Sequence, residues 1–204
     1  MKVFAAILCL LGTLTFGSTA HATELDWNQF RISYADPNLD IDSSSSSGKG
    51  FQVSGNALVT EDIFVTGEFL STSFGEQGAN LDSDFISVGA GFIRHNDERT
   101  AMYSTFTYER LEAAAFVPAL FQEERKTNGA GVNLGFRHLL NTHLELKAEI
   151  GYLLIDDSGV GRYSASAWYR PTSNVAIGLG YRLYLASEID LEVNVFTAGI
   201  EYSF

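Results

Sequence analysis

The sequence has 204 residues and a formal net charge of −12, from 13 Lys and Arg against 25 Asp and Glu. This acidic balance argues against a nucleic acid partner, because contacts with a phosphate backbone depend on clustered basic side chains. No apolar run after the N-terminal segment approaches the roughly 20 residues of a spanning helix, and the longest, AAAFVPALF at 113–121, contains Pro118. Any membrane crossing must therefore be made by strands.

The N-terminus has the features of a secretory signal peptide. Lys2 precedes an apolar stretch at 3–16, and Ala20-His21-Ala22 forms a small-x-small cleavage site. We therefore predict that residues 1–22 are removed and that residues 23–204 form a single domain. The only cysteine, Cys9, lies in the removed segment, so we expect neither disulfides nor thiolate metal ligands in the mature protein.

Alternation of apolar and polar residues predicts about ten β-strands in the mature chain. The clearest is LELKAEIGY at 144–152, where every second residue is apolar. The segments average about ten residues, close to the 9–11 residues of a tilted transmembrane strand. The predicted strands are 27–35, 50–59, 63–70, 85–93, 101–111, 128–138, 144–155, 160–170, 175–184 and 192–204.

The predicted connections alternate in length. Short turns are expected at 60–62, 94–100, 139–143 and 171–174, and longer loops on the other side at 36–49, 71–84, 112–127 and 185–191. Short periplasmic turns and long outer loops are typical of bacterial outer-membrane barrels. The connection at 156–159 is a short one on the outer side, so eight strands with a long hairpin extension remain an alternative to ten.

The last residues, NVFTAGIEYSF, place an apolar or aromatic side chain at every second position, which a soluble edge strand would leave exposed. With the signal peptide and the alternating strands, this ladder resembles small outer-membrane β-barrels of the OmpA-like and opacity-protein-like "porin family". The resemblance implies an all-β, transmembrane, antiparallel up-and-down barrel that is integral to the bacterial outer membrane, among lipid and lipopolysaccharide. It also implies that the barrel-assembly machinery recognises the last strand, through an assembly signal of Phe196, Ile200, Tyr202 and Phe204.

If the apolar faces of the strands contact lipid, the other faces point into the barrel. They carry six basic and five acidic side chains: Arg31, Glu68, Glu109, Arg137, Glu145, Lys147, Glu149, Arg162, Arg170, Arg182 and Glu201. An unpaired charge in a narrow lumen is costly, which favours a structural ion-pair network. A charge filter that lines a small pore is the alternative.

The sequence contains no pattern that predicts catalysis or a cofactor. His95, His138 and His143 all fall at predicted periplasmic turns. Outer-membrane enzymes resemble one another in carrying a histidine near the outer rim, and no histidine base is expected there in this chain. The segment DPNLDIDSSSSSG at 36–48 begins like a calcium loop, but Ile41 replaces its glycine and Ser47 its glutamate. We expect a solvated Ser-rich loop there, with a weak Ca²⁺ site as the alternative, and no catalytic, cofactor or metal site.

The predicted outer loops are strongly acidic. Their basic residues are Lys49, Arg125 and Lys126, and their acidic residues are Asp36, Asp40, Asp42, Glu76, Asp82, Asp84, Glu112, Glu123, Glu124, Asp156, Asp157, Glu188 and Asp190. Such loops attract a cationic extracellular partner and approach lipopolysaccharide only through bridging divalent cations. AAAFVPALF in the third loop is interpreted as an apolar lid or short helix at the barrel mouth, or as a surface-contact patch.

These observations predict a non-enzymatic outer-membrane barrel with a structural or surface-interaction role. A narrow porin-like channel for small solutes is the alternative function. A soluble lipocalin-like barrel is the alternative architecture, and it requires an apolar interior and a polar exterior.

Overall fold

The structure is a computed structural model that describes residues 25–41, 44–76, 79–117, 121–156, 158–186 and 191–204. The predicted signal peptide lies outside the described residues. Within them the chain forms ten strands and no helix. The strands are β1 (Gln29–Ile41), β2 (Ser44–Leu58), β3 (Ile63–Glu76), β4 (Ala79–Asn96), β5 (Thr100–Val117), β6 (Phe121–Asn141), β7 (Leu144–Ile155), β8 (Ser158–Tyr169), β9 (Val175–Ala186) and β10 (Leu191–Ser203).

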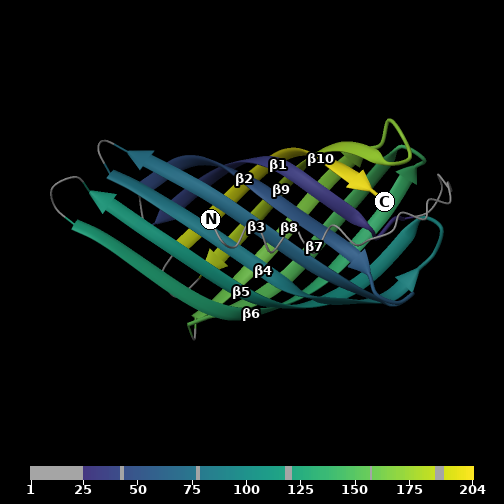
Figure 1. Cartoon of the computed structure of the whole chain (residues 1–204), viewed down its shortest axis with the longest axis horizontal. Helices are drawn as coiled ribbons and strands as arrows, with labels where there is room; N and C mark the ends of the chain where they lie inside the picture. The colour runs from purple at the N-terminus through teal and green to yellow at the C-terminus, as the bar shows by residue number, and fades with distance from the viewer. Residues whose placement is uncertain (1–24, 42–43, 77–78, 118–120, 157, 187–190) are drawn as a thin grey trace.

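Each strand pairs antiparallel with its neighbours along the chain, and β1 pairs with β10 to close the barrel (Figure 1). The closing ladder runs from Gln29 opposite Ser203 to Ile41 opposite Leu191. The prediction of a ten-stranded up-and-down barrel is thereby confirmed over the alternative of eight. The described residues contain no helix that is long and apolar enough to cross a membrane.

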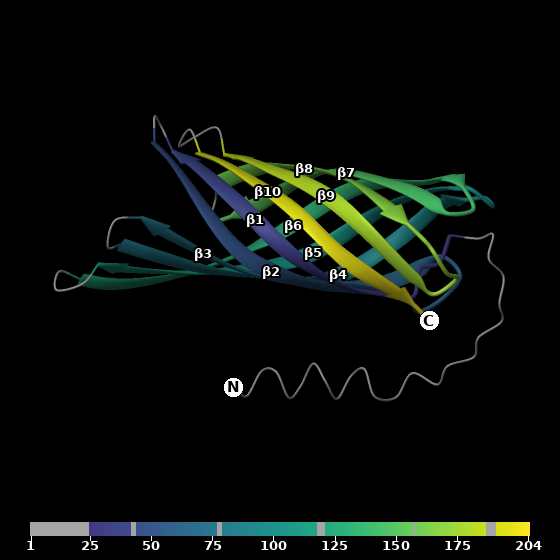
Figure 2. The same ribbon diagram turned by 90° about the horizontal axis from the view of Figure 1, so that it is seen from above.

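The two ends of the barrel differ. One end, called here the C-terminal end, holds the turns β2–β3, β4–β5, β6–β7 and β8–β9 together with Ser203, the last residue of β10. The other end, called here the tip end, holds the hairpin tips β1–β2, β3–β4, β5–β6, β7–β8 and β9–β10. Figures 1 and 2 show that the hairpins β3–β4 and β5–β6 project furthest at the tip end.

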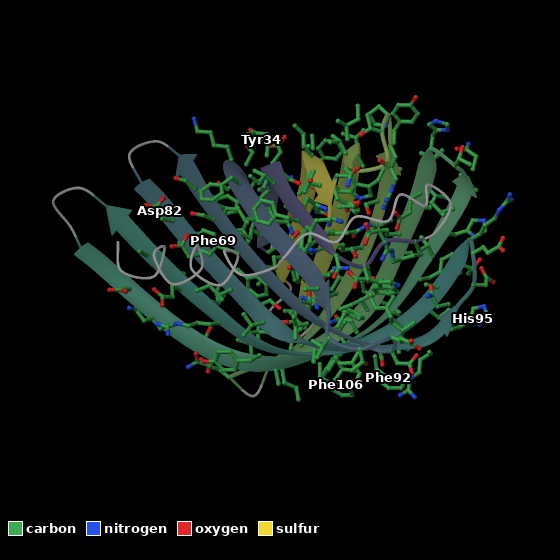
Figure 3. The ribbon with its side chains drawn as sticks, turned by 45° about the vertical axis from the view of Figure 1, so that its right-hand side comes forward. Tyr34, Phe69, Asp82, Phe92, His95 and Phe106 are labelled. Carbon is green, nitrogen blue, oxygen red and sulfur yellow. The ribbon has the colours of Figure 1, made fainter. Side chains whose placement is uncertain are left out.

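The outer surface of the wall is apolar. Phe106 and Leu134 are 63% and 60% exposed, and Figure 3 shows Phe92 and Phe106 projecting from the outside of the wall. Exposed tyrosines and phenylalanines form a band toward each end, and neighbouring strands place Tyr34 opposite Phe51 in the band nearer the tip end. Since the interior carries the charges, the lipocalin-like alternative does not hold.

The strands run further toward the tip end than the sequence pattern predicts. Most of the expected loops 36–49, 71–84 and 112–127 belong to strands, because β1 continues to Ile41, β3 to Glu76 and β5 to Val117. The expected Ser-rich loop is instead paired strand, with Asp40 opposite Ser45. These extensions contain no sustained alternation of apolar and polar residues, so that pattern could not reveal them.

The apolar segment 113–121 was predicted as a lid or short helix, and this prediction of local structure is wrong. Ala113–Val117 completes β5, Phe121 begins β6, and Val117 lies opposite Phe121 in the ladder. Residues 118–120 lie outside the described part. We call the four strand ends beyond the barrel rim, residues 71–76, 79–84, 112–117 and 121–127, the projecting sheet.

Candidate functional site

An apolar floor closes the C-terminal end of the lumen. It consists of Leu25, Trp27, Phe64, Ile93, Ala101, Tyr103 and Leu139, all buried. Trp27 is 3% exposed, and its ring centroid lies 4.8 Å from that of Phe64 and 5.3 Å from that of Tyr103. The chain before β1 therefore turns into the barrel and fills it with an indole ring.

Hydrogen bonds anchor this segment to the wall. Leu58 N donates to Asn28 Oδ1 at 2.9 Å, and Phe204 N donates to Asn28 O at 3.1 Å. From inside the barrel, Arg137 Nη2 donates to Asp26 O at 2.7 Å. The floor is therefore attached to β2, to the residue that follows β10 and to β6.

Directly above the floor lies a cluster of six charged side chains. This central cluster comprises Arg31, Arg137, Glu145, Lys147, Arg170 and Glu201. Both of its carboxylates, Glu145 and Glu201, are 0% exposed. Four cations therefore share two fully buried carboxylates, which is the geometry that makes a buried charge tolerable.

Each carboxylate of the central cluster forms ion pairs with three cations. Glu201 lies 2.7 Å from Arg31, 2.9 Å from Lys147 and 3.2 Å from Arg170. Glu145 lies 2.7 Å from Arg137, 2.5 Å from Arg170 and 3.7 Å from Lys147. The shared cations Lys147 and Arg170 connect the two carboxylates into one network.

Aromatic rings support the arginines of this network. The guanidinium of Arg31 lies 4.2 Å from the ring centroid of Trp168, and that of Arg137 lies 4.6 Å from the ring centroid of Trp27. Cation–π contacts of this kind are strongest away from water. They link the central cluster to the floor.

Two further ion pairs lie nearer the tip end. Arg182 forms a two-point contact with Glu68, in which Nη2 and Oε2 are 2.8 Å apart, and it donates to Tyr184 Oη at 3.1 Å. Arg162 lies 3.5 Å from Glu109, which also accepts from Thr107 at 2.5 Å. Both pairs join strands that are distant in sequence, since β9 contacts β3 and β8 contacts β5 across the lumen.

Glu149 differs from the other ten charged residues predicted to face the lumen. It has no ion pair within 4.0 Å among the described residues, and it accepts hydrogen bonds from Tyr103 Oη at 3.0 Å and Ser164 Oγ at 3.4 Å. The structure thus brings six of the eleven into the central cluster and four into the two outer pairs, and it places Glu149 beside Tyr103 of the floor.

A second apolar cluster crosses the lumen nearer the tip end. Ala35, Leu70, Phe85 and Val195 are buried together, and Leu111, Tyr184 and Val193 pack against them. These side chains come from β1, β3, β4, β5, β9 and β10, so the cluster reaches across the barrel. We call it the upper apolar layer.

Between the floor and the upper apolar layer is a cavity of about 130 Å³, called here the chamber. Trp27, Phe64 and Trp168 line it at one side, and Leu70 and Val195 at the other. Its charged lining is Arg31, Glu68, Arg137, Lys147, Glu149 and Arg182. The lumen is therefore a stack of apolar floor, charged chamber and apolar layer.

Several parts of this interior were not among the predicted site residues. Asp26, Gln29, Tyr103 and Asn133 all bind the predicted charges, and Asn133 accepts from Arg162 at 3.0 Å. One feature of the sequence could have indicated that rings fill the lumen. The alternating pattern places aromatic side chains on the lumen side at Trp27, Phe64 and Trp168. A polar amide such as Asn133 has no comparable signature.

The three histidines of the described residues lie at the C-terminal end of the barrel, as Figure 3 shows for His95. His95 Nε2 is 3.1 Å from Asp97, His138 Nδ1 is 3.0 Å from Thr100, and His143 Nδ1 is 2.8 Å from Thr142. Backbone N–H groups of Arg99 and Thr100 donate to Asp97 in the β4–β5 turn and lower the pKa of its carboxyl. His95 and His143 thus contact residues of their own turns, and His138 contacts the neighbouring strand β5.

Metal-binding geometry is not found in the described part of the chain, where no three His, Cys, Asp or Glu side chains converge. Asp36, Asn38 and Asp40 of the calcium-like segment lie on β1, and Asn38 Oδ1 accepts from Ser45 at 3.3 Å. Alternate residues of an extended strand spread their side chains along it, whereas a calcium loop wraps them around the ion.

The residues of the predicted assembly signal lie on or directly after β10. Phe196, Ile200 and Tyr202 are exposed on the outer surface of the barrel. β10 is paired along its length with β1 and β9, so its backbone N–H and C=O groups are engaged in the sheet of the folded protein. Its outward side chains remain accessible to lipid.

Comparison with known proteins gives a consistent architecture. The model of a family described as "Outer membrane protein beta-barrel domain" matches residues 6–168. No curated protein matches the sequence. The translocator domain of the autotransporter NalP from Neisseria meningitidis is similar at 13% identity, covering 100% of this chain and 98% of that chain, with a TM-score of 0.52.

Two other solved barrels show comparable likeness. The beta domain of the Bordetella autotransporter BrkA is 12% identical, covers 87% of this chain and 99% of its own, and has a TM-score of 0.50. Ail, the attachment invasion locus protein of Yersinia pestis, is 19% identical, with coverages of 87% and 97% and a TM-score of 0.49. At such identities the likeness concerns the fold alone.

Proposed function

Because the chain belongs to the family of outer membrane protein beta-barrel domains, we propose that it is a non-enzymatic barrel with a structural and surface-interaction role. The outer membrane is the location of this family, and the apolar outer wall described above suits contact with lipid. On this proposal the C-terminal end faces the periplasm and the tip end faces the exterior.

The closed lumen is the observation that carries the structural role. The floor, the central cluster and the upper apolar layer succeed one another along the barrel, and six of the predicted lumen charges meet in one network. Ion pairs that cross a lumen neutralise it and also occupy its cross-section. A barrel filled in this way conducts little.

The tip end supports the interaction role. Asp82, Asp84 and Glu112 lie on the outer face of the projecting sheet, and Asp84 is directly opposite Glu112. Figure 3 shows Asp82 well beyond the barrel rim. Acidic side chains gathered there attract a cationic extracellular partner and meet lipopolysaccharide phosphates through bridging divalent cations.

Conductance in planar bilayers tests the closed barrel. Wild-type protein comprising residues 23–204 is expected to conduct little. Lys147→Ala deprives Glu145 and Glu201 of a shared cation, so it should destabilise the barrel by a few kcal/mol and open a measurable conductance. Large, steady, ion-selective channels in the wild type, which Lys147→Ala merely retunes, would overturn the proposal.

Binding of a cationic polypeptide tests the surface role separately. The triple variant Asp82→Asn, Asp84→Asn, Glu112→Gln should bind polylysine more weakly than wild type, most clearly at low salt. The matched control, Glu61→Gln, Asp62→Asn, Glu98→Gln, removes the same charge from the exposed turns of the C-terminal end. Equal losses in both variants would contradict a surface specialised at the tip end.

The chamber favours a second candidate, a narrow channel for small solutes. Its lining is charged, as in the selectivity filter of a channel, and not apolar as in a protein core. Only the side chains of the floor and of the upper apolar layer separate the chamber from the two ends of the barrel. The conductance experiment distinguishes the two functions directly.

Export and insertion complete the proposal. Residues 1–22 act as a cleavable signal peptide, and residues 23–204 form the barrel domain. Phe196, Ile200, Tyr202 and Phe204 present the side chains that the barrel-assembly machinery reads before β10 pairs with its neighbours.

A further inference from the structure

The projecting sheet has one long open edge, which belongs to β6 (Figure 1). Throughout the projecting sheet β6 pairs with β5, but its pairing with β7 begins only at Gly129, opposite Ile155. Among the described residues, no strand therefore covers the other side of β6 over 121–127. At the opposite edge of the projecting sheet, β2 covers β3 as far as Phe74. The projecting sheet is thus covered on its β3 side and open on its β6 side.

The backbone of β6 directs hydrogen-bonding groups to this open side. Asp156 N donates to Asn128 O at 3.5 Å, so the carbonyl of Asn128 points away from β5. Successive residues of an antiparallel strand direct their N–H and C=O groups to alternate sides, so Glu124 and Lys126 also direct theirs away from β5. An unpaired edge of this kind is a template for pairing with a strand of another chain.

The side chains of the edge restrict which strand can pair there. Those of Glu124, Arg125 and Lys126 are 55%, 76% and 50% exposed. Charges on an edge discourage pairing with arbitrary strands, because like charges that lie directly opposite each other repel. An antiparallel copy of β6 can place each Glu124 opposite Lys126 of the other copy, and both residues direct their backbone groups to the open side. The edge is therefore complementary to itself in charge and in hydrogen bonding.

The contacts that these charges make within the chain are compatible with such a pair. Lys126 Nζ lies 2.8 Å from Glu124 and 3.6 Å from Glu112, and Arg125 lies 3.9 Å from Asp156. Exposed ion pairs contribute little to stability, so exchanging them for pairs across the new interface costs little. Arg125 lies on the other face of the strand, where it meets its own copy at the two-fold axis, and Asp156 of each copy supplies a counter-charge.

We propose that the open edge of β6 is a self-association site whose occupant is a second copy of this chain in a facing membrane. A two-fold axis perpendicular to the sheet relates the two antiparallel strands. Because the projecting sheet continues the barrel wall (Figure 2), this axis also reverses the direction of the barrel. Two copies in one membrane point the same way and cannot form this pair. The inference rests on the proposed exposure of the tip end and names the partner of that surface.

Phospholipid vesicles that carry the folded protein test the charge complementarity. Wild-type vesicles should aggregate, which light scattering measures. Vesicles with Glu124→Lys and vesicles with Lys126→Glu should each stay dispersed, because each change places like charges opposite each other. A mixture of the two should aggregate again, since opposite charges then face each other, and a folding defect cannot produce this rescue. Asp82→Lys makes the same charge change on β4, away from the edge, and should aggregate like the wild type.

Glu124→Pro tests the backbone contact. Proline removes an N–H that points to the open side and none that binds β5, so the barrel should fold while aggregation is lost. Glu124→Gln keeps this N–H and should aggregate more than Glu124→Pro. Aggregation that Glu124→Pro leaves unchanged, or a mixture of the two charge variants that stays dispersed, would overturn the proposal. Wild-type vesicles that bind polylysine but stay dispersed would overturn this inference alone and leave the proposed surface role standing.

Discussion

Glu145 on β7 and Glu201 on β10 bind the same guanidinium, since Arg170 Nη2 lies 2.5 Å from Glu145 Oε2 and 3.2 Å from Glu201 Oε1. Lys147 repeats this arrangement with the same two carboxylates. A change in either carboxylate therefore removes an ion pair from both shared cations, Lys147 and Arg170.

Glu201→Ala should be among the most destabilising substitutions in the barrel. It leaves Arg31 without its ion pair and Lys147 and Arg170 with Glu145 alone. Breaking a buried ion pair costs about 3–5 kcal/mol. Urea unfolding in detergent micelles, followed by tryptophan fluorescence, measures the loss. Glu112→Gln is the control, because it removes two partly exposed ion pairs at the tip end, with Arg110 and Lys126, each worth at most about 1 kcal/mol. Similar losses in both variants would contradict the central role of Glu201.

Trp27→Ala should both destabilise the barrel and open its C-terminal end. The substitution removes the ring that packs on Phe64 and Tyr103, and a large buried aromatic replaced by alanine costs about 3–5 kcal/mol. Conductance in planar bilayers should rise above that of the wild type. Trp27→Phe keeps an aromatic ring in the floor and should stay close to wild type in conductance, so leakage of that variant would argue against the floor as a seal.

Replacing Phe204 with Asp should impair assembly more than stability. The proposed signal is read before folding, whereas in the folded barrel the residue follows the last strand. Outer-membrane levels of protein with heat-modifiable gel migration should fall, while the unfolding midpoint of the purified, folded variant changes little. Phe204→Tyr should assemble normally, and unaltered membrane levels of Phe204→Asp would remove the support for a terminal signal.

Asp97 should contribute to stability in a pH-dependent way. Hydrogen bonds from the N–H groups of Arg99 and Thr100 lower the pKa of its carboxyl from the ordinary value of 3.8. A carboxyl with a lowered folded pKa stabilises the folded state above its unfolded pKa, and this contribution disappears as the pH falls through the folded value. The stability difference between wild type and Asp97→Ala should therefore be larger at pH 6 than at pH 2.5. A difference that does not shrink on acidification would show that the charged carboxylate is not responsible.

The cellular location of the protein tests whether it is a membrane barrel at all. The protein should fractionate with the outer membrane and migrate differently on gels with and without heating, as a closed barrel resists unfolding by detergent. Recovery as a soluble periplasmic protein would contradict membrane insertion. The apolar outer wall, with Phe106 and Leu134 more than half exposed, provides the physical reason for the expectation.

The extent of the strands shows where sequence patterns stop being informative. In LELKAEIGY the apolar face meets lipid and the other face meets the lumen, so the alternation is complete and β7 begins at Leu144 as predicted. In the Ser-rich segment of β2 and the alanines of β5, both faces of the strand lie beyond the lipid. The backbone is extended there as well, but apolar and polar residues do not alternate. Hydrogen bonding between neighbouring strands, which side-chain pattern does not encode, extends the sheet there.

The sequence by itself predicted about ten strands and the lipid-facing band, because a membrane barrel wall separates two unlike environments and therefore imposes a period of two on the residues within it. The closed sheet of the structure decided between ten strands and eight. Only the tertiary structure decided which cation meets which carboxylate. Arg182 and Glu68 lie on β9 and β3, and their contact depends on strand tilt and register around the whole barrel. The packing of Trp27 on Phe64 and Tyr103 was decided in the same way, because these rings come together only once the wall has closed.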